Sequence, residues 1–483
     1  MSITRRDALK RIGGLGALAG LPRVLPGCGG TDDTPGIKHY VYLLLENHTY
    51  DNMLGARKLM EQLPGDGLAM GMANPDGNGG MVPIHEAATA DLCVPDPPHG
   101  WDPSHAQFNN GAMDGFITQY NLSQNATGLT QVMEYLTRTH VPVTWALADK
   151  YTTCDRWFAA VMGPTLPNRA YWHCATSFGQ TTNNEILNKF AQVPVPTIYN
   201  RLQDKGIDWT YYYGSIAVAA ALGNPGPYQL DLGPNDGKTG RIRKFAGYPD
   251  DAGDPNGQFF KDCAAGKLAP VTYIDPFFYL NDDHPPTHPI MAQSLIAAVY
   301  TALAKSPLWK HCMLVITYDE HGGYFDHVPP PTTTDDTLEK FGVDGFQQMG
   351  FRVPALVIGP YAKKGYVSSV QYDHTSALKE LQTAFDLETL NVRMDMANDL
   401  SDCIDMDRLA KGEWEPPAEI PEINIDDWDH NAAGCMSDNP FIAGDPITEW
   451  ANNNPGKLPD ARADHAAYHK AIRDFLAKNQ GRF

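Results

Sequence analysis

The sequence lacks a long apolar stretch, a Cys-x-x-Cys pair, an internal repeat and an excess of basic residues. The apolar stretch nearest its start, residues Ile12 to Leu21, covers ten positions and is rich in glycine. A stable transmembrane helix needs about 20 apolar residues, so this stretch does not predict one. The missing Cys-x-x-Cys argues against a zinc ribbon or a thioredoxin-like site. Lys and Arg number 37 against 57 Asp and Glu, a net charge of −20, which argues against binding nucleic acid or anionic membranes and leaves neutral or zwitterionic partners open.

The composition is that of an ordinary globular protein. The 483 residues are 42% hydrophobic and 10% aromatic, enough for a sizeable core, which excludes disordered, collagen-like and coiled-coil chains. This length fits about three average domains or one large α/β unit equally well.

The first 27 residues resemble a twin-arginine export signal, because Arg5-Arg6 precedes the weakly apolar stretch. Two processing sites compete, a lipobox ending at Cys28 and ordinary cleavage after Ala19. We favour the lipobox, with residues 28–36 as a tether and a lipid on Cys28 as the membrane anchor. The chain is then expected to be exported, as a periplasmic or cell-envelope lipoprotein or a secreted protein.

Eight cysteines stand at irregular spacings. Lipidation of Cys28 leaves seven, which allows at most three disulfides and one free thiol. Export permits disulfides, but the sequence does not choose the pairs.

Three near-continuous apolar runs predict buried strands, at Ile37–Leu45, Met313–Tyr318 and Val353–Ile358. Such runs are typical of a parallel sheet covered on both faces, so the predicted class is α/β. Helical spacing of apolar residues over Pro289–Lys305, after a strand at Val271–Ile274, predicts a βαβ unit. We assign residues 37–410 to one catalytic domain.

Acidic and amide side chains follow two of these strands directly, as Glu46-Asn47 and Asp319-Glu320. Sites in open α/β sheets lie at the carboxyl ends of strands. If the two strands are parallel neighbours, three carboxylates and an amide oxygen meet at one edge, where a divalent cation would offset their charge. Either pair alone would more often be a helix cap or a surface turn.

Gly163-Pro-Thr165-Leu-Pro-Asn168-Arg169 places Pro two and Arg four residues after Thr165. This copies the spacing of the sulfatase nucleophile motif, with Thr in place of the Cys that becomes formylglycine. The Thr165 hydroxyl would itself attack, activated by a metal. Asn168 and Arg169 are candidate substrate-binding residues, although Arg169 could equally be structural.

Four histidines flank motifs at strand ends: His99, His284, His321 and His374. Each alone is more often a structural residue. Together they suggest acids that protonate a leaving group, or donors to phosphate oxygens.

Five motifs in order resemble one family, the phosphoesterases that include bacterial phospholipases C, acid phosphatases and plant non-specific phospholipases C. They are Glu46–Gly55, Thr165–Arg169, Asp283–Pro286, Thr317–Val328 and Phe351–Pro354. The resemblance implies an alkaline-phosphatase-like three-layer α/β/α sandwich with a mostly parallel sheet. By analogy Glu46, Asn47, Asp319 and Glu320 hold the metal together with Thr165, Thr165 attacks phosphorus, and His99 and His284 line the site as catalytic groups, with Asn168, Arg169, His321 and His374 binding substrate. His48 stands where the family commonly has Arg, a change expected to alter headgroup contacts.

The activity favoured from the sequence is phospholipase C cleavage of phosphatidylcholine-type diesters through a phosphothreonine intermediate. An acid phosphatase acting on monoesters would use the same site, and a non-catalytic lipid-anchored binding protein is a third alternative. The cation could be calcium or zinc, and the oligomeric state is open.

Residues 411–483 are expected to form an acidic strap followed by a docking helix over Asp460–Lys478. A solvated loop is favoured over a calcium site at Asp426, Asp427 and Asp429.

Overall fold

The computed structural model describes residues 34–88, 92–190, 195–214, 218–221, 242–244, 257–278 and 281–423. The predicted export signal, the lipobox with Cys28, the docking helix and the three aspartates Asp426, Asp427 and Asp429 lie outside these ranges. Within them, no helix combines the length and apolarity needed to cross a membrane.

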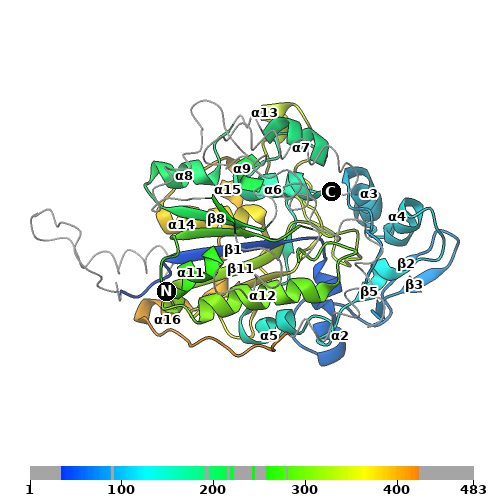
Figure 1. Ribbon diagram of the computed structural model, residues 1–483. Coiled ribbons are helices and arrows are strands. Elements are labelled where there is room, and N and C mark those ends of the chain that lie inside the picture. The colour runs from blue at the N-terminus through cyan, green and yellow to red at the C-terminus, as the bar shows by residue number, and fades with distance from the viewer. Residues whose placement is uncertain are drawn as a thin grey trace, which may run out of the picture.

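Eight of the described strands build one large sheet (Figure 1). From edge to edge its members are β13 (Val367–Ser368), β6 (Thr152–Cys154), β12 (Ala355–Ile358), β11 (Cys312–Tyr318), β1 (His39–Leu45), β10 (Val271–Asp275), β8 (Trp209–Tyr213) and β9 (Ile242–Lys244). Strand β1 runs parallel to both of its neighbours, β10 and β11. The register pairs Leu45 with Tyr318, so the residues that follow these two strands leave the sheet side by side, as predicted.

Strand β12 corrects one expectation. The run Val353–Ile358 was predicted to join the parallel set, yet β12 is antiparallel to both β11 and β6. A parallel return needs a long crossover, usually a helix. The segment between β11 and β12 contains only the five-residue helix α13 (Thr337–Phe341), so the chain doubles back instead.

Helices cover both faces of the sheet (Figure 1). On one side lie α5 (Pro142–Lys150), α11 (Gln258–Ala264) and α12 (Pro289–Ala304); on the other lie α6 (Thr165–Cys174), α8 (Ile198–Asp204) and α14 (His374–Phe385). The predicted α/β class, three layers around a mostly parallel sheet, is confirmed, and so is the βαβ unit of β10, α12 and β11.

Smaller elements surround this sandwich. Between β1 and α5 the chain forms a group seen at the right of Figure 1, comprising η1 (Asp51–Gly55), α2 (Ala56–Glu61), β2 (Ala73–Pro75), β3 (Met81–Pro83), β4 (His85–Glu86), α3 (Trp101–Phe108), η2 (Asn109–Gly111), α4 (Phe116–Ser123), η3 (Gln131–Met133) and β5 (Glu134–Tyr135). The remaining elements are β7 (Trp157–Phe158), α7 (Asn183–Phe190), α9 (Val218–Ala221), η5 (Trp309–His311), β14 (Tyr372–Asp373), α15 (Val392–Met396), η6 (Leu400–Cys403) and α16 (Met406–Lys411).

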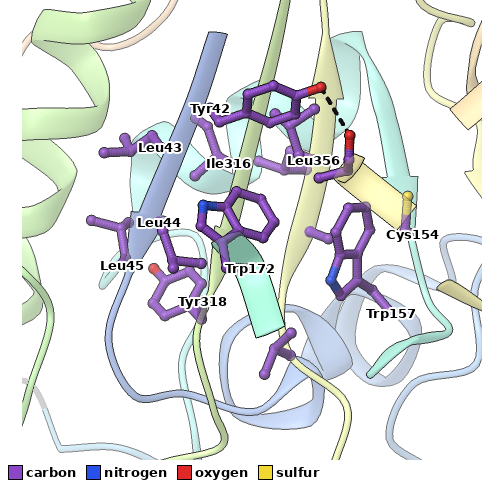
Figure 2. Close-up of a cluster of buried hydrophobic side chains, with 14 of the residues drawn as sticks. Tyr42, Leu43, Leu44, Leu45, Cys154, Trp157, Trp172, Ile316, Tyr318 and Leu356 are labelled. Atoms are coloured by element: carbon purple, nitrogen blue, oxygen red, sulfur yellow. Dashed lines mark hydrogen bonds between the residues drawn. The ribbon is translucent and has the colours of Figure 1, made fainter. Parts of the chain in front are cut away.

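The core fixes helix α6 against the sheet. Figure 2 shows Trp172 of α6 beside Tyr42 and Leu44 of β1, and its ring meets that of Tyr42 edge to face at 5.7 Å. Six of the seven residues of β1 are buried. Fully burying each large apolar side chain contributes about 1.5–3 kcal/mol. This packing holds the first turn of α6, with Thr165, at the carboxyl edge of β1 and β11.

Candidate active site

Four of the five predicted metal ligands follow β1 and β11 at one edge of the sheet. The Asp319 amide donates to the Leu45 carbonyl at 3.0 Å, and Glu46, Asn47, Asp319 and Glu320 are all at most 1% exposed. The backbones approach so closely that a Cβ on Gly322 would lie 2.1 Å from the Asn47 carbonyl oxygen.

Arg169 lies among three carboxylates. Its guanidinium is 3.0 Å from oxygens of Glu46, Asp275 and Asp319, and all four side chains are at most 3% exposed. Although burial opposes charging, these carboxylates raise the pKa of Arg169, so it stays protonated. As placed, Arg169 compensates charge inside the protein, and its predicted contact with phosphate stays a prediction. Asp275 was missed, although the rule used for Glu46 would have found it, since it directly follows the predicted strand Val271–Ile274.

Thr165 is the first residue of α6 and lies one turn from Arg169. Residues four apart share a helix face, so Thr165 faces the same edge as the carboxylates that Arg169 contacts. Its side chain is fully buried, and its Oγ1 has no hydrogen-bond partner among the described residues. Asn168, a predicted substrate contact, instead donates to the carbonyls of Val161, Gly163 and Pro164 at 2.9–3.2 Å, which fixes the turn that leads into Thr165.

The site suits a hard divalent cation, because several of its buried oxygens have no hydrogen-bond donor in the part of the chain that the structure describes. Among the predicted metal ligands, five buried oxygens lack a hydrogen-bond partner within the described residues: Glu46 Oε1, Asn47 Oδ1, Thr165 Oγ1, Asp319 Oδ1 and Glu320 Oε1. Glu46 Oε1 meets Arg169 only as an ion pair. Burial first, and then the charge of Glu46, raise the pKa of Asp319 well above its usual value. Oxygen ligands of this kind suit calcium or magnesium, and carboxylates also bind zinc.

Two other trios of described residues bring ligand atoms within 4.8 Å of one another, Asp96-His99-His284 and Asp51-Asp326-His327. The predicted set of Glu46, Asp319 and Glu320 is not such a trio within the described chain, because Arg169 lies between Glu46 and Asp319. In the second trio Arg352 already contacts Asp51 and Asp326 at 3.0 Å, so the positive charge of its guanidinium balances these carboxylates.

His99 and His284 form the histidine pair of the site. Their ring centroids are 5.5 Å apart, and His99 Nε2 is 3.9 Å from Glu320 Oε1. Both Nδ1 atoms contact backbone carbonyls, of Pro97 at 2.8 Å and Pro285 at 2.6 Å. A carbonyl only accepts, so each Nδ1 carries a proton.

The carboxylate environment keeps His284 protonated. Burial alone would lower its pKa, but Asp96, Glu46 and Asp282 outweigh burial and raise the pKa of His284 to about 9. The positively charged imidazole can therefore act as an acid near neutral pH. Asp96 was missed by the sequence reasoning, although it stands three residues before His99.

His321 and His374 are buried side chains that contact the candidate metal ligands. His321 Nδ1 is 3.0 Å from Glu320 Oε2, and its Nε2 is 2.7 Å from Gln107 Oε1. His374 Nε2 donates to the Asp319 carbonyl at 2.6 Å, and burial lowers the pKa of His374 to about 4. Both are buried and orient metal-ligand candidates, so their predicted contacts with substrate stay predictions.

His48 is buried beneath the turn that carries His284. Its Nδ1 contacts Asn52 Oδ1 at 2.7 Å and its Nε2 contacts the Asp283 carbonyl at 3.1 Å. The ring also stacks on Tyr324. These contacts occupy the side chain inside the protein, where it supports Asp283 and the neighbouring His284.

Comparisons with known proteins show which family the chain resembles. The model of the phosphoesterase family matches residues 37–388. Non-specific phospholipase C6 of Arabidopsis thaliana is 31% identical over 417 residues, which cover 80% of this chain and 75% of that protein. Phospholipase C A of Mycobacterium tuberculosis is 27% identical over 438 residues, covering 81% and 82% of the two chains.

Solved structures match this chain at much lower sequence identity. A protein of the alkaline phosphatase superfamily from Vibrio parahaemolyticus aligns over 67% of this chain and 83% of its own, with a TM-score of 0.34 and 12% identity. Human ectonucleotide pyrophosphatase / phosphodiesterase 5 covers 55% of this chain and 94% of its own, with a TM-score of 0.36 and 12% identity.

The family match spans most of the chain, and the matched residues include every acid, hydroxyl and imidazole of the site just described. The chain therefore belongs to the phosphoesterase family and is a hydrolase of phosphoester bonds.

Proposed function

We propose that this enzyme is an exported, metal-dependent phospholipase C that cleaves zwitterionic phospholipids to diacylglycerol and a phosphorylated headgroup. The observation that carries the proposal is the buried, unpartnered Thr165 hydroxyl at the sheet edge where Glu46, Asp319 and Glu320 emerge. The named relatives include phospholipases C of plant and bacterial origin, and the net charge of −20 disfavours anionic surfaces.

Glu46, Asn47, Asp319 and Glu320 would hold a divalent ion together with Thr165. When bound, such an ion lowers the pKa of the attacking hydroxyl and offsets charge on the phosphate oxygens. Arg169 keeps Glu46 and Asp319 close together despite their like charges, because its guanidinium contacts both at 3.0 Å.

The reaction proceeds in two displacements at phosphorus. Thr165 Oγ1 releases its proton to solvent and forms a bond to phosphorus while the bond to the diacylglycerol oxygen breaks, and His284 or His99 donates a proton to that departing oxygen. Water then attacks the phosphothreonine and the bond from phosphorus to Thr165 Oγ1 breaks. The phosphorylated headgroup leaves, and Thr165 Oγ1 takes up a proton from solvent. The deprotonated histidine accepts a proton of that water.

Substitution of Thr165 tests the nucleophile. We expect Thr165→Ala to lower kcat at least 10³-fold, with an unchanged circular dichroism spectrum, because the covalent route is lost. Thr165→Ser keeps a hydroxyl and should retain a measurable fraction of turnover. Thr165→Ala activity near that of the wild type would refute the assignment.

Substrate class and metal are tested with the purified enzyme. We expect turnover on phosphatidylcholine micelles to exceed turnover on p-nitrophenyl phosphate, and chelator to abolish both. The reverse preference would make the enzyme an acid phosphatase with the same site. Full activity after exhaustive chelation, with no metal found by elemental analysis, would exclude metal dependence.

Export is tested by fractionation of cells that make the full chain. The twin-arginine start predicts accumulation outside the cytoplasm, and Arg5→Lys together with Arg6→Lys should retain the protein inside. Mass spectrometry of the mature N-terminus separates a lipidated Cys28 from cleavage after Ala19.

A further inference from the structure

Two buried thiols that play no part in the hydrolytic site face each other at the edge of the sheet. Cys154 ends strand β6 and Cys403 ends η6, and their Sγ atoms are 3.7 Å apart. Both residues are fully buried. Figure 2 shows the Cys154 sulfur at the margin of the buried cluster, on the Trp157 side.

The backbone around the pair is fixed from both directions. Thr152 Oγ1 and the Lys363 amide donate to the Cys403 carbonyl, each at 3.0 Å. Next to Cys403, the Asp402 carboxylate accepts from Ser368 Oγ at 2.6 Å. Strand β6 is held between β12 and β13. The two thiols therefore meet because the surrounding fold holds them together.

A second cysteine observation points to oxidation. Cys93 is disulfide-bonded, whereas the other described cysteines carry free thiols. Disulfides persist in oxidising compartments and are rare in the cytosol.

We propose that Cys154 and Cys403 form a disulfide in the mature protein, which ties the segment after α15 to the sheet. The S–S bond is about 2.04 Å long, so the two sulfurs must close by roughly 1.7 Å from their 3.7 Å separation, a shift within reach of side-chain rotation. This inference does not depend on the substrate of the enzyme.

The oxidant is a small-molecule disulfide or an equivalent protein disulfide. One cysteine thiolate attacks it, forming a mixed disulfide and releasing one thiol. The second cysteine thiolate then attacks the protein sulfur of the mixed disulfide and releases the second thiol. Two protein S–H bonds and one oxidant S–S bond break, and one protein S–S bond and two oxidant S–H bonds form.

Burial determines when this exchange can occur. Burial, and then the neighbouring Cys403 thiol, raise the pKa of Cys154 well above its usual value, so the attacking thiolate is scarce in the folded protein. The bond should form while the chain folds and should then resist reduction.

Peptide mapping tests the pairing directly. The full chain is unfolded under reducing conditions and refolded with oxidised and reduced glutathione, then alkylated under denaturing conditions without reductant and digested. We expect a linked peptide joining Cys154 and Cys403, which disappears on reduction, while Cys174, buried and free, is alkylated as the internal control. Alkylation of both Cys154 and Cys403, or linkage of either to another cysteine, would overturn the proposal.

Thermal unfolding supplies a second measurement. The disulfide would close a loop of 249 positions, so reduction should lower the Tm of the refolded wild type. The control is the Cys154→Ala/Cys403→Ala variant, in which reduction breaks the Cys93 disulfide equally. We expect the Tm of the wild type to fall by roughly 5 °C or more beyond the fall in this variant. An equal loss in both proteins would argue against the bond. If the double variant does not fold, the peptide map decides alone.

Discussion

Replacement of Arg169 distinguishes an internal charge compensator from a phosphate clamp. The guanidinium is fully buried and lies 3.0 Å from Glu46, Asp275 and Asp319. Arg169→Met would leave three carboxylates together without a cation. Removing one partner of a buried pair costs about 3–5 kcal/mol, and the three pairs share one cation, so their costs do not add.

We therefore expect Arg169→Met to lower the free energy of unfolding by about 3–5 kcal/mol in chelator. Arg169→Lys keeps the charge but loses the forked geometry, and should cost about 2 kcal/mol. Added divalent metal should reduce both losses, since a bound cation offsets the same carboxylates. Arg138→Met is the matched control: its side chain is 41% exposed beside Glu61 and Asp149, and such surface pairs contribute at most about 1 kcal/mol.

Urea unfolding followed by circular dichroism, with kcat and KM measured in parallel, gives the required free energies. The reasoning would be refuted if Arg169→Met unfolded within 1 kcal/mol of the wild type in chelator while its KM rose tenfold or more. That result would assign the guanidinium to substrate phosphate.

Two further predictions concern groups behind the site. Burial, and then the charge of Arg169, lower the pKa of His173 to about 3, below its unfolded value near 6.5. The unfolded chain then binds a proton that the folded chain does not, so this stabilisation is complete above pH 6.5 and is lost as pH falls toward 3, by about 2 kcal/mol at pH 5. Urea titrations at pH 7.5 and pH 5 should show that His173→Gln loses less free energy of unfolding between these two pH values than the wild type does. Equal losses in the two proteins would contradict the assignment. Gln107→Ala removes the 2.7 Å contact to His321 and should lower kcat/KM roughly three- to tenfold, about 1 kcal/mol, with KM little changed; an effect confined to KM would instead place Gln107 against substrate.

The sequence by itself determined the local features that carry the site. The apolar runs that became β1, β10 and β11 are near-continuous because those strands are buried on both faces, and Glu46 and Asp319 follow them directly. Thr165 begins α6 within its own motif. Each of these features is a matter of neighbouring residues, and periodicity and spacing report such features well.

Only the tertiary structure decided which distant groups meet. Arg169 contacts Asp275 and Asp319 across 106 and 150 positions of the chain, so the guanidinium lies inside a buried acidic cluster, a position that the sequence did not indicate. The reversed direction of β12 and the approach of Cys154 to Cys403 likewise depend on how loops return to the sheet. Spacing along the chain carries no information about such contacts, because they are fixed by the packing of helices and strands whose ends are far apart in sequence.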